Sequence, residues 1–167
     1  MSHLDPGAGL TIRTMKERDL DRVIAVASVL ATAPQWSRSA YEDAVIAGNG
    51  LRRIALVAES SGEVIGFAVA LVLGSQAEIE SIAVDSEAQG FGFGSALLVA
   101  LLQELRRAGV AEVELEMRAS NGMACRLYER AGFREMGRRR EYYRDPVEDA
   151  ALLGLKLIDC PELKFLE

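Results

Sequence analysis

A glycine-rich segment, QGFGFGS at positions 89–95, carries the first chemical signal in this chain of 167 residues. Glycines at alternate positions allow positive φ angles and let the backbone approach a ligand closely. The segment lies between a predicted strand and a leucine-rich predicted helix, so the unpaired N–H groups and the positive dipole end of that helix point at it. These features predict a site for a phosphate or diphosphate, with a plain tight turn as the alternative.

Two familiar nucleotide-binding motifs do not fit this segment. A dinucleotide fingerprint needs its third glycine three residues after the second, but that position holds Ser95 when the count starts at Gly90 and Leu97 when it starts at Gly92. A P-loop also fails, because no Lys-Ser or Lys-Thr pair follows the glycines. The segment therefore predicts phosphate binding without a Rossmann or P-loop domain.

Acidic side chains alternate along the stretch 110–118 that follows this helix. Strand periodicity places Glu112, Glu114 and Glu116 on one face and apolar side chains on the other. A strand that follows a crossover helix is expected inside the sheet, where carboxylates need a water-filled cleft or neutralising partners. Glu116 comes last, at the C-terminal end of the strand, where ligands gather in open α/β sheets. A strand with one solvated face is the plainer interpretation.

Composition restricts the chemistry further. The single histidine, His3, lies in a predicted N-terminal tail, so neither a Ser-His-Asp or Cys-His site nor a histidine-based metal site is expected. Cys125 and Cys160 form no CxxC pair, which favours a reducing, cytoplasmic compartment. The net charge of −6 argues against a nucleic-acid partner and tolerates a cationic substrate. No membrane span or leader segment is predicted.

The elements that must position these residues follow from hydrophobic periodicity and turn signals. Helices are predicted at 19–30, at 37–47, from just after Gly94 to 108, and at 121–130. Strands are predicted at 10–15, 53–59, 64–73, 77–85, 110–118, 133–138 and 150–157. This order predicts a mixed α/β fold, a central sheet of about seven strands flanked by about four helices. One domain is expected at 10–157, with tails at 1–9 and 158–167.

The glycine-rich segment also fits the pattern Q/R-x-x-G-x-G/A, and it resembles the acetyl-CoA signature of the GNAT acyltransferases. The resemblance implies that the loop amides hold the diphosphate of acetyl-CoA and that the pantetheine arm pairs with the preceding strand like an additional strand. At Phe91 members of that family often carry Arg or Lys, so one cation beside the phosphates is missing. The coenzyme contacts implied here are Ile82, Ala83, Val84, Gln89, Gly90, Phe91, Gly92, Phe93, Gly94 and Ser95.

Two further stretches, LEMRASN at 115–121 and LYERAGF at 127–133, resemble the RimI-type ribosomal-protein alanine N-acetyltransferases. That branch acetylates the N-terminal alanine of a small-subunit ribosomal protein, and the resemblance covers about residues 10–157. By position it implies Glu116 as general base, Tyr128 as general acid and Asn121 as a further coenzyme contact. More loosely, it implies that Trp36, Tyr142 and Tyr143 contact the acceptor.

These residue types suit the acetylation of an amine. An α-ammonium has a pKa of about 8 and must lose a proton before its nitrogen attacks a thioester. A carboxylate can take that proton, a neutral phenol can protonate the departing thiolate, and an N–H group near Val84 can polarise the thioester oxygen. Glu78, Glu80 or an ordered water are alternatives for the base.

The sequence thus predicts an N-acetyltransferase that moves acetyl from acetyl-CoA to a primary amine, foremost the N-terminal amine of a ribosomal protein. Two alternatives stay open at this point. One is a GNAT enzyme for a small amine, such as a polyamine or an aminoglycoside, and the other is a CoA-binding module without catalysis.

Overall fold

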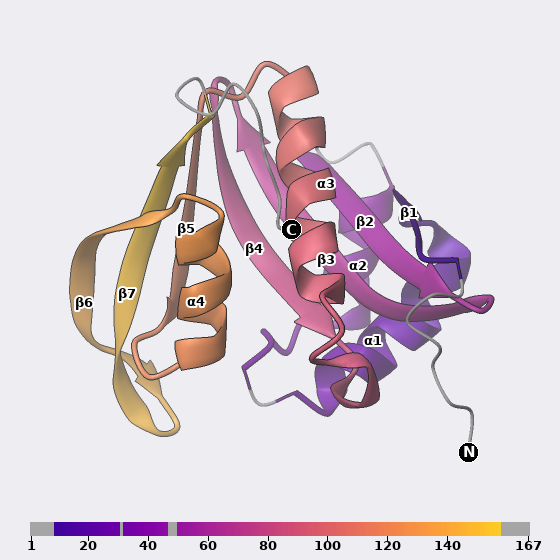
Figure 1. Cartoon of the computed structure of the whole chain (residues 1–167), viewed down its shortest axis with the longest axis horizontal. Helices are drawn as coiled ribbons and strands as arrows, with labels where there is room; N and C mark the ends of the chain where they lie inside the picture. Colours follow the sequence, from indigo (N-terminus) through magenta and orange to yellow (C-terminus); the bar gives the residue numbers. More distant parts are fainter. Residues whose placement is uncertain (1–8, 31, 47–49, 158–167) are drawn as a thin grey trace.

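The computed structural model of the chain describes residues 9–30, 32–46 and 50–157. Within these ranges seven strands form one mixed sheet in the order β1-β2-β3-β4-β5-β7-β6, flanked by four α-helices (Figure 1), which confirms the predicted fold class. Strands β4 and β5 are parallel, and all other neighbouring pairs are antiparallel. His3, Cys160, the predicted end of the second helix at 47–49, and the predicted tails apart from Gly9 lie outside the described residues.

The elements follow the predicted order with small shifts of their ends. The strands are β1 Thr11–Thr14, β2 Arg52–Ser60, β3 Glu63–Leu73, β4 Gln76–Val84, β5 Glu112–Arg118, β6 Arg134–Arg144 and β7 Val147–Lys156. The helices are α1 Leu20–Ser28, α2 Arg38–Val45, α3 Phe93–Arg107 and α4 Gly122–Arg130, with short 3-10 turns η1 Glu17–Asp19 and η2 Ser86–Ala88. The last hairpin differs most from the prediction, because β6 extends six residues beyond 138 and β7 begins three residues before 150.

Apolar side chains form one cluster on each face of the sheet. On one face α3 buries its stripe of five leucines, and the apolar side of α4 packs at the margin of the same cluster. On the other face α1 and α2 bury Leu20, Val23 and Tyr41 against Val57 and Phe67. Burying one such side chain contributes roughly 2 kcal/mol, so the two clusters fix both helical layers onto β2, β3 and β4.

The central parallel pair separates after a short common stretch. Strand β4 pairs with β5 only from Gln76 to Glu78, opposite Glu112 to Glu114, and from there the two strands diverge (Figure 1). A bulge accompanies the divergence: Val69 of β3 pairs with Ser81 while the next residue, Ala70, pairs with Ile79. Glu80 is therefore an extra residue in β4, and such bulges bend a strand. The edges of β4 and β5 that face each other beyond this point have no strand partner among the described residues.

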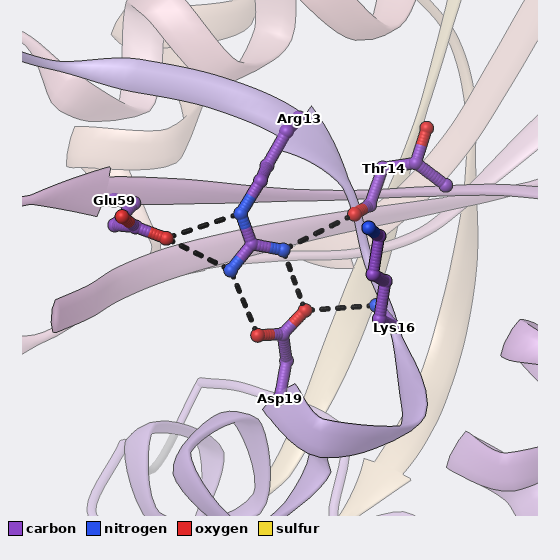
Figure 2. A network of polar contacts seen from close by, with 5 residues as sticks. All are labelled: Arg13, Thr14, Lys16, Asp19 and Glu59. Atoms are coloured by element: carbon purple, nitrogen blue, oxygen red, sulfur yellow. Dashed lines mark hydrogen bonds and ion pairs between the residues drawn. The ribbon is translucent and has the colours of Figure 1, made fainter. Parts of the chain in front are cut away.

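An ion-pair network connects β1, β2 and the start of α1 through a single guanidinium group (Figure 2). Arg13 donates to both carboxylate oxygens of Asp19, at 2.8 and 2.9 Å, and its Nε and Nη2 donate to Oε2 of Glu59, at 3.1 and 2.8 Å. Asp19 Oδ2 also accepts the backbone N–H of Lys16 at 2.8 Å. Asp19 is only 5% exposed, and the hydrogen bonds from Arg13 lower its pKa.

We expect Asp19→Asn to reduce the free energy of unfolding at pH 7 by about 2–3 kcal/mol, because the Arg13 guanidinium loses the more buried of its two charged partners. The pKa of Asp19 is lower in the folded state than its ordinary value of 3.8. The stabilisation is therefore present above about pH 4 and is lost as the pH falls through the lower, folded-state pKa. Chemical denaturation gives the free energy of unfolding of parent and variant at pH 7 and at pH 3. The difference between the two proteins should be smaller at pH 3 than at pH 7.

The matched control is Asp21→Asn, two residues away in α1. Its carboxylate pairs with Arg38, but the side chain is 85% exposed. The variant should therefore lose less than about 0.5 kcal/mol of its free energy of unfolding. Equal losses for the two variants would contradict a structural role for the Arg13 network.

Candidate active site

Two adjoining cavities lie along the free edge of β4, one beside α4 and one beside the end of β5. The first, here named the glycine-loop cavity, measures about 570 Å³ and lies between the end of β4, the loop 88–92, the start of α3 and one side of α4. The second, named the carboxylate cavity, measures about 430 Å³ and lies between β4, the end of β5 and the segment 32–35. Both are lined by Thr32, Ala33, Ile82, Asn121 and Ala124, so a ligand can extend from one cavity into the other.

The glycine-loop cavity collects the predicted coenzyme contacts. All of them line it except Phe91, which is 47% exposed and packs its ring against that of Phe93 with centroids 6.1 Å apart. Gly92 has φ +83°, a conformation that side chains disfavour, and α3 begins at the next residue. The Gln89 side chain donates to the Val84 carbonyl oxygen at 3.0 Å and so attaches the loop to the end of β4.

Glu116 and Tyr128 both line the carboxylate cavity. Glu116 Oε1 lies 3.3 Å from Arg139 Nε, and the carboxylate also accepts a hydrogen bond from the Tyr142 hydroxyl, which raises the pKa of Tyr142. The predicted row of carboxylates on β5 is thus present, with Val113 and Leu115 buried on the opposite face. Two partners from β6 hold the last carboxylate of the row at the cavity.

The two alternative carboxylates on β4 lie in different surroundings. Glu80 also lines the carboxylate cavity, but Arg53 of β2 holds it at 2.7 Å, and both side chains are 16% exposed. Glu78 lines neither cavity. Partial desolvation of Glu78 and the nearby charges of Glu116 and Glu80 raise its pKa. Glu116 and Glu80 both reach the cavity, but the Glu116–Arg139 contact, at 3.3 Å, is longer and more exposed than the Glu80–Arg53 pair, at 2.7 Å. Glu116 is therefore the carboxylate of the two that is less tightly held by an arginine.

Tyr128 is almost fully enclosed at the floor of the carboxylate cavity. Its side chain is 7% exposed and its ring meets that of Phe133 edge-on, with centroids 5.5 Å apart. Burial raises the pKa of Tyr128 well above its ordinary value of 10, so the hydroxyl stays protonated at neutral pH. Asn121 begins the helix that carries this tyrosine, and its side chain accepts the N–H of Ala124 at 3.2 Å.

Strand β6 reaches the cavity through an irregular stretch. Arg139 pairs with Ala150, and Tyr143 pairs with Glu148. Between these two pairs the chain advances four positions along β6 but only two along β7. Glu141, at the centre of this stretch, has φ +49° and donates its N–H to Asp149 Oδ1 at 2.9 Å. Tyr143 lines the cavity as a result, while Tyr142 is half exposed beside it, with the two ring centroids 5.2 Å apart.

Sequence reasoning missed two residues that hold this wall in place. The Arg118 guanidinium lies 4.4 Å from the centre of the Tyr143 ring, donates to the carbonyl oxygens of Asp145 and Pro146, and contacts Glu148 at 3.3 Å. Glu148 also accepts the Ser120 N–H at 2.6 Å, and these hydrogen bonds lower its pKa. The sequence signals for Arg118 are its place inside the LEMRASN stretch and at the C-terminal end of the strand that carries Glu116.

Trp36 lies outside the lining of the carboxylate cavity. Its ring packs against Tyr41 at the margin of the α1–α2 cluster, with centroids 5.2 Å apart. Pro34 and Gln35, which precede it, line the cavity instead. The predicted acceptor contact at Trp36 thus stays a prediction, and the segment that carries it does reach the site.

Within 9–30, 32–46 and 50–157, no group of three or more His, Cys, Asp or Glu side chains is placed to hold a metal ion. In the same part of the chain, no helix has the length and the apolar character needed to cross a bilayer.

Comparison with known proteins identifies the family. Residues 16–133 match the model of the Acetyltransferase (GNAT) family, and the chain belongs to this family. It is an acetyl-CoA-dependent N-acetyltransferase, as the sequence predicted.

Particular relatives narrow the similarity further. The ribosomal protein bS18-alanine N-acetyltransferase of Escherichia coli (strain K12) is 35% identical over 149 residues, 88% of this chain and 97% of its own. The enzyme of that name from Haemophilus ducreyi is 30% identical over 149 residues, 87% of this chain and 99% of its own. The crystal structure of the Escherichia coli ribosomal-protein-S18-alanine N-acetyltransferase gives a TM-score of 0.77 at 33% identity, over 89% of this chain and 94% of that one. Ard1 from Thermoplasma volcanium gives 0.77 at 28% identity, over 88% and 97%.

Gly66 of β3 sets how closely this strand approaches the wall of the glycine-loop cavity. A Cβ atom there would lie 2.8 Å from the Ala83 carbonyl oxygen and 3.1 Å from Leu97 Cδ1. We expect Gly66→Ala to displace the end of β4, to weaken acetyl-CoA binding at least about tenfold, and to cost about 1–3 kcal/mol of stability. Titration calorimetry with acetyl-CoA and thermal unfolding measure the two effects.

Gly137→Ala on β6 is the matched control. Its added Cβ would make an ordinary contact of 3.7 Å with Leu152 Cδ1, so both measurements should stay close to those of the parent. If Gly66→Ala binds acetyl-CoA as tightly as Gly137→Ala does, the spacing at Gly66 does not shape the cavity.

Proposed function

We propose that this chain acetylates the N-terminal α-amine of a protein, and that an alanine terminus of ribosomal protein bS18 is its acceptor. The observation that carries the proposal is the junction of the two cavities, which joins a phosphate-compatible loop to a cavity lined by Glu116 and Tyr128. The names of the relatives support the choice of acceptor. Such an acceptor also supports a cytoplasmic site of action, and we assign the activity to a single domain at 10–157.

The glycine-loop cavity fits the donor. The described residues that line it include no acidic side chain, and the glycines leave the backbone of the loop open to a diphosphate. The unpaired edge of β4, from Ile82 to Val84, offers backbone groups to the amides of a pantetheine arm in the manner of an added strand. We propose the predicted contacts that line this cavity, Asn121 among them, as the coenzyme-binding residues.

The proton transfers are assigned to the carboxylate cavity. Bound acetyl-CoA supplies a thioester, whose acetyl group moves to the amine nitrogen as the C–S bond breaks. The Glu116 carboxylate takes the proton that the acceptor ammonium must lose, directly or through one water. Arg139 and Tyr142 keep this carboxylate in place. The Tyr128 hydroxyl, kept neutral by burial, gives its proton to the departing sulfur, and the second proton that the attacking nitrogen loses on becoming an amide restores the phenol.

The lining of the carboxylate cavity favours the N-terminus of a peptide as acceptor over a small amine. Tyr143 and the segment 32–35 both line the cavity, and half-exposed Tyr142 extends the aromatic surface beyond it. We propose that Tyr142, Tyr143 and, at the margin, Trp36 contact the peptide. Glu80, Glu116 and Asp145 line the same cavity, and these carboxylates favour a cationic terminus.

An acceptor panel tests the proposed function. We expect a peptide with the N-terminal sequence of bS18 to exceed spermidine and an aminoglycoside in kcat/KM by at least about a hundredfold, because only the peptide fills the aromatic wall. Thiol release from acetyl-CoA gives the rate, and the mass of the product gives the site. The same peptide with a blocked α-amine should not react. A preference for the small amines would contradict the proposal, and CoA binding without any transfer would favour the non-catalytic alternative.

Replacing the proposed base separates it from its neighbour. We expect Glu116→Gln to lower kcat at pH 7 by at least about a hundredfold while the dissociation constant of acetyl-CoA changes less than about twofold. Glu78→Gln, which removes a charge from the same sheet face outside both cavities, is the matched control and should keep most of the activity. A large loss of kcat in Glu78→Gln with little loss in Glu116→Gln would assign the base to Glu78. A small effect of both variants would favour ordered water as the base.

A further inference from the structure

The two cavities differ in charge. Glu80, Glu116, Arg118 and Asp145 are the charged side chains that line the carboxylate cavity. Among the described residues, the charged side chains that line the glycine-loop cavity are both arginines, Arg126 and Arg130. The net charge of the chain is −6, so a described lining of this size that has two cations and no carboxylate indicates an anionic ligand.

The loop itself supplies no cation. From Asp85 to Leu105 the sequence contains no Lys or Arg, so the glycine loop and the start of α3 offer backbone amides and the helix dipole but no side-chain cation. The exposed side chain at the middle of the loop is Phe91, which stacks on Phe93 rather than lining the cavity. Any side-chain charge for the ligand must therefore come from the opposite wall, which is α4.

Both arginines face that cavity from successive turns of α4. They are four residues apart, which places them on one side of the helix with about 6 Å between them along its axis. Met123 and Leu127 of the same side also line the cavity. Neither arginine forms an ion pair within the described part of the chain, in contrast to Arg13, Arg53 and Arg118. Their guanidinium groups are thus available to a ligand.

We propose that Arg126 and Arg130 bind the phosphate groups of the coenzyme across the cavity from the glycine loop and supply the charge that Phe91 does not. A guanidinium group donates planar, charge-assisted hydrogen bonds that suit phosphate oxygens. The phosphates are then held between the backbone amides of the loop on one side and two arginines on the other. This inference rests on the use of acetyl-CoA as donor, and it concerns donor affinity rather than proton transfer.

Calorimetric titration of the unliganded protein with CoA and with dephospho-CoA, which lacks the 3′-phosphate, tests the proposal. We expect Arg126→Gln and Arg130→Gln each to weaken CoA binding about tenfold, and the double variant about a hundredfold. At saturating acetyl-CoA, kcat should stay within about twofold of the parent, because neither arginine lines the carboxylate cavity. Equal losses for the two ligands would assign the arginines to the diphosphate, and a loss confined to CoA would assign them to the 3′-phosphate.

Arg107→Gln is the matched control. It removes the same charge from an exposed arginine at the far end of α3, about 20 Å from the glycine loop, and should leave both affinities unchanged. Thermal unfolding confirms that each variant is folded. A folded double variant that binds CoA as tightly as the parent would overturn the proposal. A parent protein that binds neither ligand would instead contradict the use of acetyl-CoA, which is a separate failure.

Discussion

The separation of β4 from β5 is the constraint on which the rest of the site depends. Buried backbone N–H and C=O groups need partners, and two strands that diverge inside a sheet leave a row of such groups on each inner edge. Here the shared pairing ends at Glu78 and Glu114, although β4 continues to Val84 and β5 to Arg118. A ligand that carries its own amides can satisfy the free edges. The free edges of the gap therefore suit an extended, peptide-like ligand of the kind proposed above.

Side chains around the gap then keep it open and divide it into two ends. The Arg53–Glu80 pair holds the bulge of β4 from across β3, and the contact of Arg118 with Glu148 holds the turn of the last hairpin against the end of β5. Positive charge gathers at the glycine-loop end and carboxylates at the other. This division matches a reaction between an anionic donor and a cationic acceptor, and it lets each substrate enter beside groups of opposite charge.

The features that depend on local sequence were predictable, and those that join distant segments were not. Strand alternation placed Glu116 on the correct face, and the glycine spacing placed the loop at the start of α3, because both follow from backbone geometry within a few residues. The Arg13–Glu59 and Arg118–Glu148 contacts connect residues 46 and 30 positions apart and depend on strand order, which no short pattern states. Arg126 and Arg130 stand at helical spacing in the sequence, but only the packing of α4 shows which side faces the cavity. Phe91 belongs to the motif, but its side chain packs against Phe93 and does not line the glycine-loop cavity. The motif fixes the path of the backbone and does not fix the direction of each side chain.

The irregular stretch of β6 has a consequence for how the acceptor preference of this fold can change. In a regular strand Tyr142 and Tyr143 would face opposite sides of the sheet. They lie together near Glu116 in the irregular stretch around Glu141, whose left-handed conformation the Asp149 carboxylate supports through the Glu141 N–H. The aromatic wall therefore depends on a residue of the neighbouring strand that lines neither cavity. An exchange at position 149 is therefore a short evolutionary route to a new substrate repertoire in the proposed site, since it removes the support of Glu141 and leaves the proposed coenzyme loop and the proposed proton-transfer residues unchanged.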